Sequence, residues 1–298
     1  MPAPYDLMAL GAAACWALSS ILSVSPARHL GAFAFTRWRM LLVALMLWAV
    51  TLATGSWRSV APPSWGVLAL SGLIGIFIGD TALFAAMNRL GPRRAGVLFA
   101  THAVFSAWLG LWLLGERMSL QAALGAGLTL SGVMTAILLG RHKEESHAWE
   151  SDRGHVGLGV ALGLLAALCQ AASSVIVKPV MGAEVDPVAA SAVRVTVACG
   201  VHFILLWLGF SVARAHQAPT LRVLAQTALN GFIGMGVGMT LILLALKKGD
   251  VGMVAILSSV SPVLVLPLLW LRLGRAPAPA AWLGAALTVV GTVLILLR

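Results

Sequence analysis

Long apolar runs separated by short polar stretches cover almost the whole chain. The ten runs lie at 6–25, 33–53, 65–86, 95–114, 119–139, 155–177, 188–209, 222–246, 251–271 and 278–297. A helix needs about 20 apolar residues to cross a bilayer, and continuous runs indicate helices, because barrel strands alternate apolar and polar positions. The pattern predicts an all-α integral membrane protein with ten transmembrane helices.

The second half of the chain repeats the first. Residues 72–139 and 231–298 align without a gap at an offset of 159, with 19 identities in 68 positions, and six of these pair glycine with glycine. Upstream, Cys15 to Ser20 matches Cys169 to Ser174 at an offset of 154, and we match Arg37 with Arg194 at an offset of 157. This self-similarity indicates an internal duplication.

The repeat length determines the expected topology. Each copy contains five predicted spans, and an odd number of spans inserts the second copy upside down relative to the first, as in many secondary transporters. We therefore expect two inverted five-helix repeats. The first covers 1–140, a polar connecting loop covers 141–154, and the second covers 155–298.

Composition agrees with a membrane location. The chain is 60% hydrophobic and 10% charged, with a mean hydropathy of +0.95, whereas soluble domains carry about 25% charged residues. We attribute the net charge of +10 to helix ends facing lipid headgroups and expect no nucleic-acid partner. No Lys or Arg precedes the first span, so we expect it to be retained and not cleaved as a signal peptide. The three cysteines show no metal or disulfide spacing.

The segment from Leu113 to Ser119, which contains Gly115 and Glu116, precedes Gly125 and Gly132 in "LGAGLTLSGV". With the helix count and repeat length, this pattern resembles the EamA-type repeat of the drug/metabolite transporter superfamily, in which a short "GE" turn joins the fourth and fifth helices. The second repeat departs from it, because Arg275 stands where Glu116 stands in the first. The resemblance implies a ten-helix exporter of amino acids, other metabolites or drugs, in a bacterial inner (plasma) membrane.

The orientation in the membrane has two opposing indications. Loops on the face of the chain termini hold six basic residues, and loops on the other face hold eleven. The positive-inside rule then favours termini outside, whereas the family resemblance implies cytoplasmic termini. Both alternatives stay open.

Ionisable residues at membrane depth are costly and are functional candidates by default. Asp80, His102 and Arg37 lie about 9, 10 and 6 Å below one face at 1.5 Å per residue. They are our candidates for gating or proton coupling, with Asp80 held ionised by Arg37 and His102 able to titrate near neutral pH. Arg194 is expected at the inverted-equivalent place. The alternatives are that Asp80 only neutralises Arg37 or orients His102, and that the arginines extend toward the headgroups.

Neutral polar groups form a second set of candidates. Spans 1 and 6 carry groups that could bind a zwitterionic ligand, and span 9 carries serines before a proline that frees a carbonyl and bends the helix. Such serines also bond within their own helix in many membrane proteins. The substrate-binding candidates are Trp16, Ser19, Ser20, Asp80, His102, Gln170, Ser173, Ser258, Ser259 and Ser261, and Pro262 joins the gating candidates.

These patterns predict a secondary transporter with a central cavity lined by spans 1, 3, 4, 6, 8 and 9. We expect export of small metabolites, amino acids first, by alternating access. The alternative substrates are multiple drugs, and a membrane-embedded enzyme is the other class considered. No phosphate-binding loop ending in Lys-Ser or Lys-Thr is present, so we expect no ATP hydrolysis and no cofactor. A proton is the candidate coupling ion, and a homo-oligomer is possible.

Overall fold

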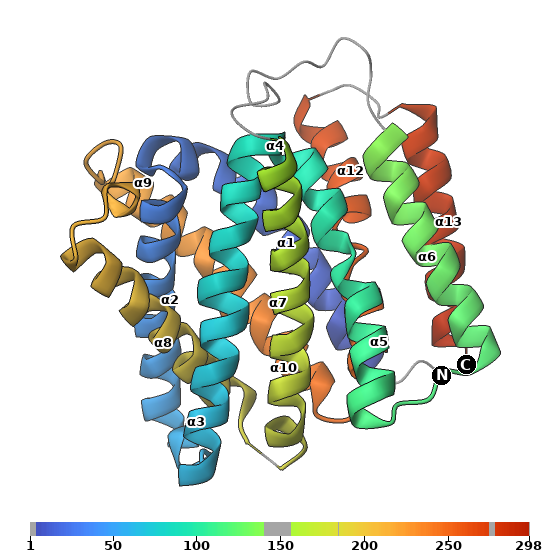
Figure 1. The fold of residues 1–298 in the computed structure, drawn as a ribbon, viewed down its shortest axis with the longest axis horizontal. Coiled ribbons are helices and arrows are strands. Elements are labelled where there is room, and N and C mark those ends of the chain that lie inside the picture. Colours follow the sequence, from blue (N-terminus) through green and yellow to red (C-terminus); the bar gives the residue numbers. More distant parts are fainter. Residues whose placement is uncertain (1–3, 140–155, 184, 274–277, 298) are drawn as a thin grey trace.

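The computed structural model describes residues 4–139, 156–183, 185–273 and 278–297 as a helical bundle (Figure 1). In the first repeat the elements are α1 (Pro4–Leu30), α2 (Ala32–Thr54), η1 (Ser56–Ser59), α3 (Pro62–Ser71), η2 (Gly72–Asp80), α4 (Thr81–Ala100), α5 (His102–Leu114) and α6 (Leu120–Leu139). In the second they are α7 (Val156–Gly182), α8 (Pro187–Trp207), η3 (Ser211–Ala213), α9 (Leu221–Gly231), η4 (Phe232–Met239), α10 (Thr240–Leu246), α11 (Val251–Ser258), α12 (Ser261–Leu273) and α13 (Pro279–Leu296).

Ten stretches of the described chain are long and apolar enough to cross a membrane, which confirms the predicted number of spans. Span 3 comprises α3, η2 and the start of α4, and span 8 comprises α9, η4 and α10. Span 9 comprises α11 and most of α12. The predicted connecting loop 141–154 and position 275 lie outside the described residues.

The inverted relation of the repeats is visible where α6 packs against α13 at one edge of the bundle (Figure 1). Gly125 faces Gly291 and Gly132 faces Gly284, so the two helices run antiparallel. A methyl group on any of these four glycines would collide with backbone of the opposing helix. Small residues at such positions let membrane helices approach closely.

The first helix of each repeat packs inside the other repeat. α1 contacts α9, η4, α10, α11 and α12, all from the second repeat, whereas α7 contacts α3, η2, α4 and α5 from the first. The repeats are therefore interleaved: α1 belongs to a group of helices from the second repeat, and α7 belongs to a group from the first.

Spans 3 and 8 each contain a wide π-helical segment, η2 and η4, at equivalent positions. Such segments are rare and often mark functional sites. A methyl group on Gly75 of η2 would collide with Ser173 Oγ of α7, and one on Gly234 of η4 would collide with Ser19 Oγ of α1. The π-helical segments thus lie against the exchanged first helices, near the middle of the bundle.

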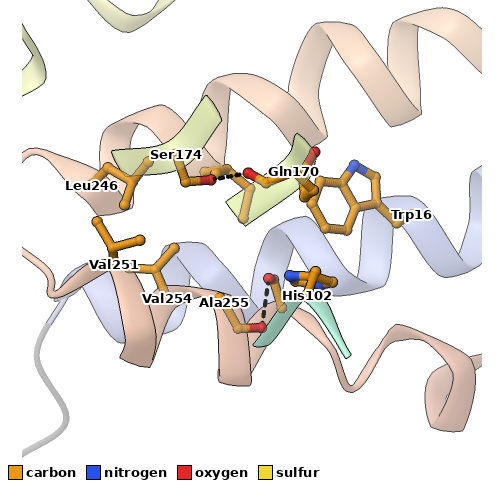
Figure 2. A pocket seen from close by; sticks show the side chains of 10 residues that line it. Trp16, His102, Gln170, Ser174, Leu246, Val251, Val254 and Ala255 are labelled. Carbon is orange, nitrogen blue, oxygen red and sulfur yellow. Dashed lines mark hydrogen bonds between the residues drawn. The ribbon is translucent and has the colours of Figure 1, made fainter. Parts of the chain in front are cut away.

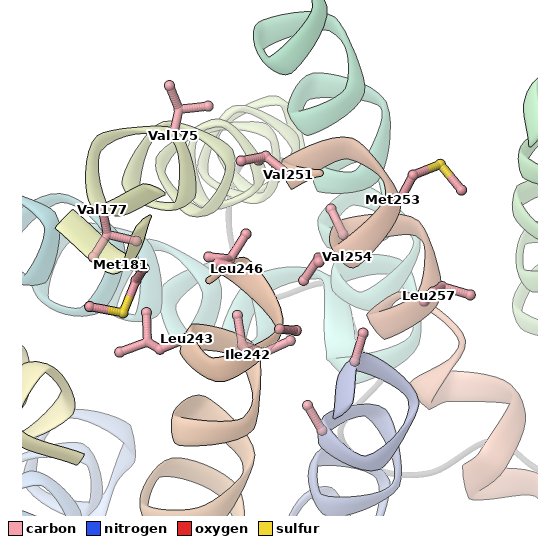
Figure 3. Close-up of a cluster of buried hydrophobic side chains, with 14 of the residues drawn as sticks. Val175, Val177, Met181, Ile242, Leu243, Leu246, Val251, Met253, Val254 and Leu257 are labelled. Carbon is pink, nitrogen blue, oxygen red and sulfur yellow. The ribbon is translucent and has the colours of Figure 1, made fainter. Parts of the chain in front are cut away.

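The largest apolar core is built around α7, α10 and α11 (Figure 3), with further buried residues from α1, α3, α5, α6 and α8. Met181, Leu243 and Leu257 are fully buried in it. Burial of a side chain of this size contributes about 1.5–3 kcal/mol. This core holds together one end of spans 6, 8 and 9, next to the pocket described below.

Candidate functional site

A small pocket lies where helices of the two repeats meet (Figure 2). The space inside it that a water-sized molecule can enter is about 10 Å³, and residues of spans 1, 4, 6, 8 and 9 line it: Trp16, His102, Gln170, Ser174, Ile242, Leu246, Val251, Val254, Ala255 and Ser258. Span 3, which we expected in the lining, contributes no residue to this pocket. A cavity needs about 10–15 Å³ of such space to hold one water molecule, so this conformation is nearly closed.

The polar groups of the lining are neutral hydrogen-bonding groups. Ser174 Oγ donates to the carbonyl of Gln170 at 3.0 Å, and Ser258 Oγ donates to the carbonyl of Ala255 at 3.1 Å. Trp16 Nε1 donates to the carbonyl of Gly234 at 3.0 Å, so the indole N–H is bound to η4. The indole then offers the pocket an apolar aromatic surface and no free donor. The hydroxyl oxygens of both serines keep lone pairs with which to accept a hydrogen bond from a bound molecule.

Two lining groups have hydrogen-bonding capacity that the described residues do not use. The Nδ1 atom of His102 is buried without a hydrogen-bond partner among them, and the side-chain amide of Gln170 makes no hydrogen bond to any of them. Buried polar groups are nearly always satisfied. A polar ligand or water in the pocket is the natural partner for His102 Nδ1, and the partly exposed amide of Gln170 is available to the same molecule.

Breaks in spans 4 and 9 position part of this lining. Span 9 is interrupted between α11 and α12, just before Pro262, as the proline predicted. Span 4 is interrupted at Thr101, and α5 then begins at His102. At the offset of 159, Thr101 corresponds to Val260 in the span 9 break. No proline marks the break in span 4, but the repeat alignment with Pro262 could have indicated it.

Asp80 pairs with a different arginine from the one we expected. Its Oδ2 lies 3.1 Å from Nη2 of Arg39, and this ion pair joins span 3 to span 2. Arg37 instead donates from Nη1 to the carbonyl of Ala213 beyond span 7. The prediction that Arg37 neutralises Asp80 was therefore wrong. His102 lies in the pocket and bonds to neither residue, so the expected three-residue cluster is not formed.

The repeat equivalence of the arginines is also corrected. Arg39 is the eighth residue of α2, and Arg194 is the eighth residue of α8. Gly72 lies against the backbone of Arg194, and its equivalent Gly231 lies against Arg39. Arg39, not Arg37, thus corresponds to Arg194. Arg194 Nη2 donates to Ser173 Oγ at 2.9 Å, and its positive charge also acts on Asp80.

Two of the predicted substrate serines make contacts between helices and do not line the pocket. Asn230 Nδ2 donates to Ser19 Oγ at 3.0 Å, and Ser71 Oγ lies 2.9 Å from Ser173 Oγ. The two pairs are equivalent, since the offset is 154 between the predicted serines and 159 between their partners. Asn230 and Ser71 were missed by sequence reasoning, although the repeat alignment would have paired them.

Three further predicted serines, Ser20, Ser259 and Ser261, do not line the pocket. Ser20 Oγ donates to the carbonyl of Ala17, and Ser259 Oγ donates to the carbonyl of Ile256, so each bonds within its own helix. Ser261 begins α12 and is not among the lining residues. Of the ten substrate-binding candidates, the structure brings Trp16, His102, Gln170 and Ser258 together in the pocket.

Comparison with known proteins gives a family match and a fold match. A family model described as "EamA-like transporter family" matches residues 3–138 and 157–297, once in each half of the chain. No curated protein matches the chain. A solved structure titled "Crystal structure of protein" matches with a TM-score of 0.79 and 21% identity, covering 99% of this chain and 96% of that one. At this identity the likeness shows a shared fold.

Proposed function

Because the chain belongs to the EamA-like transporter family, we propose that it is a secondary transporter that exports small metabolites, amino acids first, by alternating access. The observation that carries this proposal is the pocket built jointly by both repeats, in which a tryptophan ring, an imidazole, an amide and two hydroxyls converge. Transporters with inverted repeats place their substrate near the middle of the bilayer, where the repeats meet.

The chemistry of the lining supports a small, neutral or zwitterionic substrate. None of the side chains that line the pocket is an acid, a lysine or an arginine. The apolar side of the pocket, with Ile242 and Val254, suits an aliphatic or aromatic group, while Gln170 and His102 supply hydrogen bonds. A free amino acid with an uncharged side chain combines both features, since its ammonium and carboxylate groups cancel at neutral pH.

Multidrug export and enzyme activity are the less favoured alternatives. The pocket has room for about one water molecule in this conformation, so any substrate needs a wider cavity in another conformation, and a drug-sized molecule needs the larger expansion. A membrane-embedded enzyme is less favoured, because the imidazole of His102 has no carboxylate beside it in the pocket. For the location we propose a bacterial inner (plasma) membrane, since helical bundles occupy such membranes and outer-membrane proteins are barrels.

Alternating access follows from the way the spans are built. The breaks in spans 4 and 9 lie beside the pocket. The π-helical segment η4 of span 8 accepts a hydrogen bond from the lining residue Trp16. Irregular helices at the substrate site are typical of secondary transporters. For coupling we propose the ion pair of Asp80 and Arg39, with Arg194 as its third member and a proton as the candidate ion. His102 is a second, separate candidate for proton coupling, inside the pocket.

Counterflow into proteoliposomes tests the proposal. Vesicles loaded with one unlabelled amino acid at high concentration should accumulate the same labelled amino acid, while vesicles without protein should not. A panel of amino acids and a panel of lipophilic dyes, run side by side, separates metabolite export from multidrug export. Counterflow of dyes but of no amino acid would contradict the proposed substrate class, and counterflow of neither would contradict the function.

A further inference from the structure

The turn between α10 and α11, formed by residues 247–250, is held by charged side chains from two other elements. Glu116 follows span 4 in the first repeat, and Lys178 lies near the end of span 6. Glu116 binds the first N–H groups of α11, just after the turn, and Lys178 binds the last carbonyl of α10 and one carbonyl within the turn. We call the membrane face that carries this turn and residues 115–119 the clamp face; it is the lower face in Figure 1.

Glu116 binds the start of α11 with both carboxylate oxygens. Oε1 accepts from the N–H of Val251 at 2.6 Å, and Oε2 accepts from the N–H of Gly252 at 3.1 Å. The first N–H groups of a helix have no partner within the helix and carry its partial positive charge. A bidentate carboxylate therefore fixes where α11 begins.

Lys178 binds the end of α10 as a hydrogen-bond donor, whereas Glu116 is an acceptor at the start of α11. Its Nζ donates to the carbonyl of Leu246 at 2.8 Å and to the carbonyl of Gly249 at 2.8 Å. Carbonyls at the end of a helix likewise lack partners within the helix. The charges of Glu116 and Lys178 also attract each other across the turn. Together the two side chains hold both sides of the same four-residue turn.

The chain before Glu116 is shaped for this contact. Gly115 has a φ of 65°, in the left-handed region that glycine adopts without strain. The carboxylate of Glu116 folds back against Gly110, where a methyl group would collide with it. The "GE" turn of the first repeat therefore positions the Glu116 carboxylate against the start of α11 in the second repeat.

The turn borders the pocket. Leu246 ends α10 and Val251 begins α11, so these residues flank the turn, and both line the pocket (Figure 2). Gly252, the second residue bound by Glu116, packs directly against Ala107 of α5. The held turn therefore fixes the positions of Leu246 and Val251 in the pocket lining relative to each other.

We propose that Glu116 and Lys178 form a clamp that closes the pocket at this face, and that substrate passes this face only after the clamp has released the turn. This inference rests on the proposed transport function. Glu116 and Lys178 are positioning residues, because they act through α10 and α11 and do not line the pocket.

The rate at which a cysteine in the pocket is labelled from one face measures how often the clamp is open, independently of transport. The reporter is Ser174→Cys, in a chain whose Cys15, Cys169 and Cys199 are replaced by alanine. A membrane-impermeant maleimide is applied to one face of proteoliposomes, and a protease-cleavable tag after residue 298 reports the orientation. With Glu116→Ala, labelling from the clamp face should rise at least about tenfold, since two hydrogen bonds to a charged group are worth more than one decade.

Matched variants distinguish opening of the clamp from a general destabilisation of the helical bundle. Arg117→Ala changes an exposed charged residue next to Glu116 and should label like the parent. Lys178→Met should raise clamp-face labelling as Glu116→Ala does, and it carries the test if Glu116→Ala does not fold. Equal labelling of Glu116→Ala and Arg117→Ala would overturn the proposal, and so would an equal rise from both faces. Absence of counterflow would refute the transport function and leave these labelling results intact.

Discussion

The carboxylate of Asp80 lies 3.1 Å from the guanidinium of Arg39. Both residues lie within membrane-spanning helices, and their ion pair joins span 3 to span 2. The side chain of Arg39 is 10% exposed and that of Asp80 is 24% exposed. Arg194 contributes a second positive charge near the same carboxylate, from the equivalent position of the other repeat. The counterpart of Asp80 in the second repeat is Met239, so two related arginines share one acid.

Asp80→Asn should destabilise the protein by about 3 kcal/mol, because removal of one partner leaves the other charge buried and unpaired. The measurement is the midpoint of thermal unfolding in detergent. Asp80→Asn combined with Arg39→Gln should recover at least half of the loss, since both charges are then gone. A double variant no more stable than the single one would show that the ion pair is not the reason for the loss.

The glycine contacts between α6 and α13 predict a second stability effect. Gly284→Ala and Gly291→Ala each place a methyl group against backbone of α6, and overpacking of this kind costs about 1–3 kcal/mol. Gly127→Ala is the matched control, because a methyl group there meets open space and alanine favours the helix by about 1 kcal/mol. If Gly284→Ala unfolds at the same temperature as Gly127→Ala, the two helices do not approach each other this closely.

Adjacent serines in span 9 provide a matched test of the pocket. Ser258 and Ser259 are almost equally buried, and each donates to a carbonyl of its own helix, but only Ser258 lines the pocket. Ser258→Ala should raise the apparent KM of the substrate found by counterflow about fivefold, from loss of one hydrogen bond of about 1 kcal/mol. Ser259→Ala should leave KM unchanged. Equal effects of the two substitutions would remove Ser258 from the substrate site.

The clamp should respond to pH. Burial raises the pKa of the Glu116 carboxyl above its usual range, and nearby Asp250 also raises it, whereas the Val251 and Gly252 N–H groups and Lys178 lower it. In an open clamp the carboxyl meets water and regains its ordinary pKa, about 4.3. The closed state therefore binds the proton more tightly and is favoured as the pH falls.

Clamp-face labelling of the Ser174→Cys reporter should accordingly increase as the pH rises from the ordinary pKa to the raised one. Rates are divided by those of an exposed reference thiol, Arg117→Cys, to remove the pH dependence of the reagent. With Glu116→Gln the corrected rates should no longer vary with pH. A corrected rate that increases as the pH falls would contradict the raised pKa of Glu116 in the closed clamp.

The spans and their inverted arrangement could be predicted because both are properties of the sequence pattern. Apolar runs of sufficient length have one stable outcome in a bilayer, and an odd number of spans per copy requires inversion. The break in span 9 was also predictable, because Pro262 lacks the N–H that a continuous helix needs. The exchange of first helices was not, since one-dimensional periodicity does not identify the neighbour of a helix.

The partner of Asp80 could not be derived from depth alone. Arg37 and Arg39 differ by only about 3 Å along the helix axis, but they are rotated by about 200° around it. They therefore face different neighbours, and depth arithmetic does not distinguish them. The same limit applies to Ser258 and Ser259, which are rotated by about 100°. The contact of Glu116 with Val251 joins residues 135 positions apart and depends on how the repeats pack.

The interleaving of α1 and α7 determines an order of events during synthesis. α1 leaves the ribosome first, yet α9, η4, α10 and α11, against which it packs, are translated more than 190 residues later. At about 5–20 residues per second, α1 spends tens of seconds in the lipid without these neighbours, whereas α7 finds its own already inserted. A nascent chain stopped after the first repeat would hold α1 without its packing partners from the second repeat, so neither repeat is an independent folding unit.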